Sequence, residues 1–160
     1  MSKHAQTTFT LAASLSLVLM GSGAATAADS WLGMWKANPA KSTYSPGPAP
    51  KSTVARMEAW EGGLKGSTDG VGADDKPTHT EFAGKFDGKD YPYKGNPAYD
   101  AISLKRVDDN TYEVALKSKG KVMLTIRNVI SKDGKTRTQT STGTDAQGHA
   151  IKNVVVFDRQ

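Results

Sequence analysis

Residues 99–131 read YDAISLKRVDDNTYEVALKSKGKVMLTIRNVIS, and this stretch decides the fold class. Three apolar sets alternate with polar residues along it: Ile102 and Leu104, then Tyr112, Val114 and Leu116, then Val122, Leu124 and Ile126. A period of two residues places each set on one face of a β-strand. Turn-forming residues at 108–110 and 118–120 separate the strands, so we expect antiparallel hairpins that share one apolar face.

Alternation and turn signals continue on both sides of this stretch. We expect further strands over 30–36, 53–60, 64–71, 78–86, 136–142 and 151–157, with Asp87-Gly88 and Asp133-Gly134 as hairpin turns. Tyr91 and Tyr93 flank Pro92, which indicates an edge strand or a bulge. Turn signals recur roughly every ten to twelve residues, without helical periodicity. The predicted fold class is therefore all-β, an antiparallel meander closed into a barrel of about eight to ten strands.

The first residues predict a secretory signal peptide over 1–27. Lys3 and His4 give a basic start, and 11–20 is an apolar run too short to span a bilayer. Residues 25–27 form an A-x-A cleavage site, and an uncleaved amphipathic anchor is the alternative. We expect one domain over 28–160, with a proline-rich crossing segment over 38–52 that Tyr44 pins to the body. The expected localisation is periplasmic or secreted, in a bacterium.

Composition limits the partners of this chain. The expected mature chain has 133 residues and no cysteine, with 20 basic and 16 acidic residues and a net charge of +4. The charges are interspersed without a long basic run, which favours a solvated barrel surface over a nucleic-acid footprint. We expect a monomer, without nucleic-acid partners and without stable insertion into a membrane.

Motifs for catalysis or metal binding do not stand out. His79 and His149 lie far apart in the sequence, whereas structural zinc takes about four Cys or His ligands. Asp74-Asp75 lies in a predicted turn, where such side chains ordinarily bond to nearby backbone. No nucleophile elbow or phosphate-binding loop occurs, and paired carboxylates for glycoside chemistry stay open because their separation in space is not readable from sequence. We expect neither an enzyme nor a bound metal or cofactor.

Three residues at the ends of the predicted barrel carry a family resemblance. Gly33-Met34-Trp35 on the first strand, the meander of hairpins and Arg159 on the last strand resemble the calycins, which include lipocalins and fatty-acid-binding proteins. The resemblance implies that Gly33, Trp35 and Arg159 close one end of the barrel, with the guanidinium stacked on the indole. The segment WKANPAKSTYSPGPAPKS and the turns DGKDYP and SKDGKT also resemble a group of small exported bacterial proteins of unassigned function.

The candidate ligand-binding residues are Arg56, Trp60, Phe82, Arg106 and Tyr112. The three aromatic residues can ring a lumen, and the two arginines share the parity of apolar neighbours on their strands. Either arginine can therefore point inside; the alternative is that both lie at strand ends and extend to water. If the alternating threonines of 136–142 face inward, the lumen is partly polar.

A barrel of about eight strands can hold one small ligand. We therefore expect an exported binding protein for a small apolar or amphipathic molecule, including fatty-acid-like molecules whose anionic head meets an inward arginine. The alternative is a periplasmic interaction or inhibitor module that uses its loops and has a filled barrel. An open cavity ringed by Trp60, Phe82 and Tyr112 favours the first function, and a filled interior with exposed Tyr91 and Tyr93 favours the second.

Overall fold

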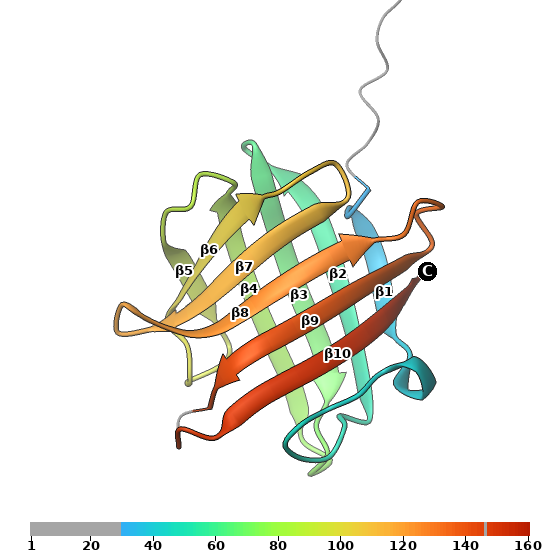
Figure 1. The fold of residues 1–160 in the computed structure, drawn as a ribbon, viewed down its shortest axis with the longest axis vertical. Coiled ribbons are helices and arrows are strands. Elements are labelled where there is room, and N and C mark those ends of the chain that lie inside the picture. The colour runs from blue at the N-terminus through green and yellow to red at the C-terminus, as the bar shows by residue number, and fades with distance from the viewer. Residues whose placement is uncertain (1–29, 146) are drawn as a thin grey trace, which may run out of the picture.

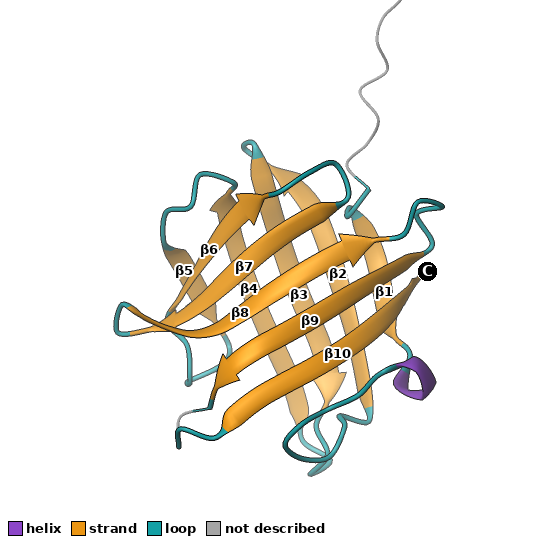
Figure 2. Ribbon diagram, viewed as in Figure 1, coloured by secondary structure: helices purple, strands orange, loops and turns teal. Residues whose placement is uncertain are grey.

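The computed structural model describes residues 30–145 and 147–160. The expected signal peptide over 1–27 lies outside the described residues. The strands are β1 (Gly33–Ala37), β2 (Ser52–Trp60), β3 (Gly63–Val71), β4 (Pro77–Lys85), β5 (Tyr91–Lys94), β6 (Ala101–Arg106), β7 (Thr111–Ser118), β8 (Lys121–Ile130), β9 (Thr136–Thr144) and β10 (Ala150–Arg159). A short 3₁₀ helix, η1 (Pro39–Lys41), follows β1 (Figure 2).

The ten strands form one closed antiparallel barrel in which each strand pairs with its sequence neighbours and β10 returns to β1. Figure 1 shows β7 to β10 crossing in front of β2, β3 and β4. Closure places Trp35 of β1 opposite Arg159 of β10. The predicted all-β antiparallel barrel is confirmed, with a strand number at the upper end of the expected range.

The proline-rich crossing segment follows β1 and lies along the start of β10. Thr43 and Val154 exchange two backbone hydrogen bonds, of 2.8 and 2.9 Å, and the Lys152 amide donates to the Ser45 carbonyl at 2.8 Å. Tyr44 is half-buried against the core. Because prolines cannot donate to a ladder, the segment runs along the barrel instead of forming a further full strand.

β5 is the shortest link in the wall. It pairs with β4 through Glu81↔Lys94 and Phe82↔Tyr93, and with β6 through Tyr91↔Ile102 and Pro92↔Ala101. Pro92 has no N–H to donate, which accounts for the short ladder at this position. Within the described part of the chain, no helix is long and apolar enough to cross a membrane.

The two ends of the barrel differ. Trp31 and Trp35 lie at the start of β1 and are fully buried. The ring of Trp31 makes edge contacts with those of Phe86 and Tyr112, with ring centroids 5.6 and 5.5 Å apart. This aromatic plug closes the end at which β1 and β9 begin and β10 ends. The opposite end, where β2 and β4 begin, is lined by smaller and more polar residues, so the interior opens in that direction.

Candidate ligand-binding site

A cavity of about 360 Å³ lies inside the barrel. Its apolar and aromatic lining is Met57, Phe82, Tyr93, Ile102, Tyr112, Val114, Leu116, Ile126 and Phe157. Its polar lining is Thr53, Thr68, Thr78, Thr80, Asn96, Asn128, Arg137 and Gln139, and Pro50 lies at the entrance side. The cavity thus combines apolar walls with nearly as many polar residues, whereas a small-molecule site usually has fewer polar groups on a mainly apolar lining.

Arg137 is the charged residue among those that line this cavity. It lies on β9 between Ile130 of β8 and Phe157 of β10, and only 1% of it is exposed. Its guanidinium carbon lies 4.2 Å from the centre of the Phe157 ring and 5.5 Å from that of Trp35. Among the described residues no carboxylate forms an ion pair with it, and its Nε and Nη1 have no hydrogen-bond acceptor.

The charge of Arg137 is only partly compensated by its surroundings. Burying an ion costs several kcal/mol even after relaxation. The cation–π contact with Phe157 offsets about 2 kcal/mol of this cost when desolvated. The hydrogen bond with Tyr112 supplies a neutral partner, which leaves the charge in place. Burial lowers the pKa of Arg137 and raises the pKa of Tyr112, while a guanidinium stays protonated in proteins. The cavity therefore holds a positive charge that an anion would neutralise.

Three further polar side chains extend this group across neighbouring strands. Tyr112 of β7 is paired with Asn128 of β8, and Asn128 is paired with Gln139 of β9. Asn128 is 2% exposed, and its Oδ1 accepts no hydrogen bond from any described residue. The wall formed by β7, β8 and β9 thus offers guanidinium donors, which suit a carboxylate or a comparable oxyanion, and beside them an amide oxygen that suits a donor group of a ligand.

The closed end carries the contact that the calycin resemblance implies. The Arg159 guanidinium carbon lies 4.3 Å from the Trp35 ring centre. Arg159 donates from Nε to the Gly134 carbonyl at 2.6 Å, from Nη1 to that of Leu32 at 2.6 Å, and from Nη2 to that of Ser30. Gly33 has φ +113°, and a Cβ there would lie 2.9 Å from Arg159 Nη1. Only glycine fits this combination of backbone angle and close approach.

Of the predicted ligand-binding residues, Phe82 and Tyr112 line the cavity. The structure corrects the placement of Arg56 and Trp60, because Thr53 and Met57 of β2 face the lumen and the alternate residues face outward. Arg56 is exposed, and the Trp60 ring packs against Tyr91 with centroids 6.2 Å apart.

Arg106 also lies outside the cavity, at the end of β6. Its guanidinium carbon is 4.9 Å from the Trp31 ring centre, and its Nη2 lies 3.2 Å from Asp109 Oδ1. It therefore covers the outer side of the aromatic plug. The strand-end position weighed as the alternative for this arginine is the one observed.

The threonines of 136–142 face outward, and the residues between them face the lumen. Arg137 and Ser141 are buried, and Gln139 lines the cavity. β9 is polar on both faces, so alternation alone gave no direction for it. A usable signal was its partner β10, in which the lumen-facing Val155 and Phe157 pair with Gln139 and Arg137.

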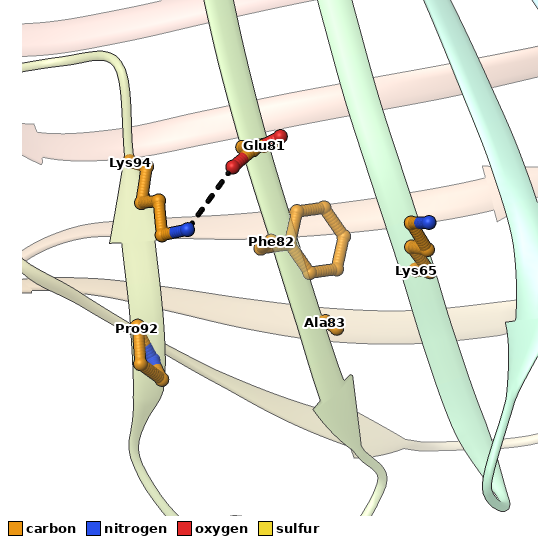
Figure 3. A pocket seen from close by; sticks show the side chains of 6 residues that line it. All are labelled: Lys65, Glu81, Phe82, Ala83, Pro92 and Lys94. Atoms are coloured by element: carbon orange, nitrogen blue, oxygen red, sulfur yellow. Dashed lines mark hydrogen bonds and ion pairs between the residues drawn. The ribbon is translucent and has the colours of Figure 1, made fainter.

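A second hollow, of about 370 Å³, lies on the outer surface over β3, β4 and β5 (Figure 3). Its rim includes Lys65, Glu81 and Lys94, all exposed, and Lys94 Nζ pairs with Glu81 Oε1 at 3.2 Å. The volume is close to that of the lumen, but the charged groups are solvated and one pair is already neutralised. We therefore assign the site to the lumen, where the charge is buried.

A scan against protein-family models finds no match for this chain, and a search of the curated proteins finds no similar sequence. No cluster of three or more His, Cys, Asp or Glu side chains suited to a metal ion occurs within 30–145 and 147–160. The closed antiparallel meander is consistent with a calycin-like fold. Function has to be inferred from the cavity and its charge.

Proposed function

We propose that this protein is an exported binding protein that holds one small amphipathic molecule in the barrel, with an anionic head group on Arg137. The carboxylate would lie at the closed end of the lumen, beside Arg137 and Tyr112, where it would compensate the guanidinium charge. The apolar part would lie against Met57 and Phe82. The proposed place of action is the periplasm or the exterior, after cleavage near Ala27.

The observation that carries this proposal is a buried arginine that lines the cavity and lacks an acidic partner among the described residues. In a filled barrel, as in an interaction module, such a group would only lower stability, because its buried charge would stay uncompensated. Tyr91 and Tyr93 are half-buried, and Tyr93 lines the cavity, so neither presents a fully exposed ring to a protein partner.

The first test is native mass spectrometry of protein purified from its own host, because it requires no guess about the ligand. A bound small molecule is expected, on a chain whose mass begins near Ala28. The stripped protein is then titrated with decanoic acid and with decanol, and the fluorescence of Trp35 reports binding beside Arg137. Arg137→Met should lower the affinity for decanoic acid roughly 10- to 100-fold, because charge-assisted hydrogen bonds are lost. The affinity for decanol should stay nearly unchanged.

Arg56→Met is the matched control, since it removes the same charge from the outer face of β2. It should leave both affinities unchanged. If no ligand co-purifies and wild-type protein prefers neither probe, the binding function is wrong and the loop-mediated interaction module takes its place. Equal losses for Arg56→Met and Arg137→Met would show that surface charge, and not the lumen, attracts the acid.

A further inference from the structure

The lumen has a second polar wall on the side opposite Arg137. Four threonines, Thr53, Thr68, Thr78 and Thr80, line the cavity from β2, β3 and β4. Thr68 is paired with Thr80, while Gly70 is paired with both Thr53 and Thr78. A Cβ on Gly70 would lie 2.4 Å from the Ser52 carbonyl oxygen and 3.1 Å from Thr78 Oγ1, so the close approach of β2 requires glycine at this position. The four threonines therefore lie on one part of the wall, across three neighbouring strands.

The two polar walls lie across the barrel from each other. Two strands, β5 and β6, separate β4 from β7, and two others, β10 and β1, separate β9 from β2. They also differ in depth. Arg137 and Tyr112 lie near the starts of β9 and β7, beside the aromatic plug, whereas Thr53 and Thr78 lie at the starts of β2 and β4, at the open end. Apolar side chains such as Phe82 and Ile102 lie between the walls.

The size of the cavity limits what can connect the two walls. A protein cavity of about 150 Å³ holds one benzene molecule. The lumen, at about 360 Å³, is more than twice that size and holds roughly fourteen non-hydrogen atoms on the same scale. That number matches a medium-chain acid and is too small for a long-chain one.

We propose that the ligand is a medium-chain hydroxy acid, with its carboxylate on Arg137 and its hydroxyl on the threonine wall. This inference rests on the proposed function and adds the second polar group of the ligand. Threonine hydroxyls donate and accept hydrogen bonds and carry no charge, so they match a hydroxyl better than a second carboxylate. A plain alkyl tail would leave the hydroxyls of Thr53 and Thr68, both half-buried, facing carbon atoms without a hydrogen-bond partner, whereas Thr80 already bonds to Tyr93.

The experiment compares decanoic acid with ω-hydroxydecanoic acid, which differ only in the terminal hydroxyl, by isothermal titration calorimetry. Wild-type protein should bind the hydroxy acid more tightly, by about 2- to 10-fold for each hydrogen bond gained. Thr53→Val/Thr68→Val removes two lumen hydroxyls at nearly constant volume, keeps the Thr80–Tyr93 hydrogen bond, and should abolish the preference for the hydroxy acid. The control, Thr138→Val/Thr140→Val, makes the same change on the outer face of β9 and should preserve it.

The outcomes separate this inference from the proposed function. If both acids bind with equal affinity, or decanoic acid binds more tightly, the hydroxy-acid inference is overturned and the binding function stands. If neither acid binds, the proposed function falls as well. Equal loss of preference in the inner and outer double variants would also overturn the inference. The wild-type comparison needs no variant, so a poorly folded inner variant does not affect that part of the test.

Discussion

Arg137 and Arg159 both lie against the indole of Trp35, but their remaining contacts differ in kind. Arg159 is exposed, yet each of its three nitrogens donates to a backbone carbonyl, those of Ser30, Leu32 and Gly134. Arg137 is 1% exposed, yet two of its nitrogens have no acceptor among the described residues. The better-solvated arginine is thus the more completely bonded one.

The difference separates the structural role of Arg159 from the binding role that we propose for Arg137. Arg159 joins β10 to the start of β1 and to the β8–β9 turn, so its contacts hold the closed end together. Arg137 is held by rings on two sides and by Tyr112, which position the guanidinium without neutralising it. A buried charge without a counter-ion lowers stability and raises affinity for an anion. The two arginines should therefore respond to substitution with opposite signs.

The largest expected effect comes from removing the indole that the two arginines share. Trp35 is fully buried, so Trp35→Ala should lower the free energy of unfolding by about 3–5 kcal/mol. Arg159→Ala should cost about 1.5–3 kcal/mol, because its charged hydrogen bonds to carbonyls are lost. Since the two side chains touch, the double variant should lose less than the sum, with a coupling of about 0.5–3 kcal/mol.

Urea unfolding of the four proteins measures this cycle. Arg56→Ala, on the outer face of β2, serves as the control and should change stability by no more than about 0.5 kcal/mol. Strict additivity of Trp35→Ala and Arg159→Ala would mean that the stacking contributes nothing and that the closed end is held by the carbonyl bonds alone.

The next prediction tests the opposite signs directly. In ligand-free protein, Arg137→Met should raise the free energy of unfolding by about 1–4 kcal/mol, as when buried ionic groups are replaced by apolar ones of similar volume. Arg159→Met should lower it by about 1.5–3 kcal/mol. Chemical denaturation of stripped protein measures both. If Arg137→Met lost as much stability as Arg159→Met, Arg137 would have a structural role like that of Arg159. The proposed difference between the two arginines would then be wrong.

The sequence predicted the Arg159 side of this comparison and missed the Arg137 side, for a physical reason. The closed end is built from a recognisable motif: a glycine with positive φ at Gly33, the indole of Trp35 and the guanidinium of Arg159. The strands were equally readable, because alternation and turn residues are local. Ten strands were found where eight to ten were expected.

Predicting which residues line the lumen requires knowing which alternate set of each strand faces inward. Alternation does not show this where both faces of a strand have similar residues. On β9 the threonines alternate with Arg137 and Gln139, and a shift of one residue exchanges the two sets. On β2 the bulky Trp60 suggested the inner face, but Trp60 lies at the barrel end, and Met57 belongs to the core. The pairing of β9 with β10, whose Val155 and Phe157 face the lumen, decides which set of β9 residues is inside.

The smallest expected effect concerns Tyr112, the neutral partner of Arg137. If Tyr112 were ionised, the tyrosinate would neutralise Arg137, and the lumen would hold no excess charge. Burial raises the pKa of Tyr112 above its ordinary value of 10.0, although the charge of Arg137 acts in the opposite direction. The phenol therefore stays protonated in the folded barrel while the unfolded chain ionises.

Because the folded-state pKa is raised, the contribution of Tyr112 to stability is fully present below pH 10 and declines as pH rises through the folded value. Relative to Tyr112→Phe, wild-type protein should lose stability above pH 10, by up to about 1.4 kcal/mol per pH unit. Absorbance titration of tyrosinate in the two proteins locates the ionisation, and denaturation at pH 9 and above measures the loss. A wild-type titration that shows one extra tyrosinate already below pH 10 would mean that Arg137 carries its own counter-ion, and the lumen would then offer an anion little attraction.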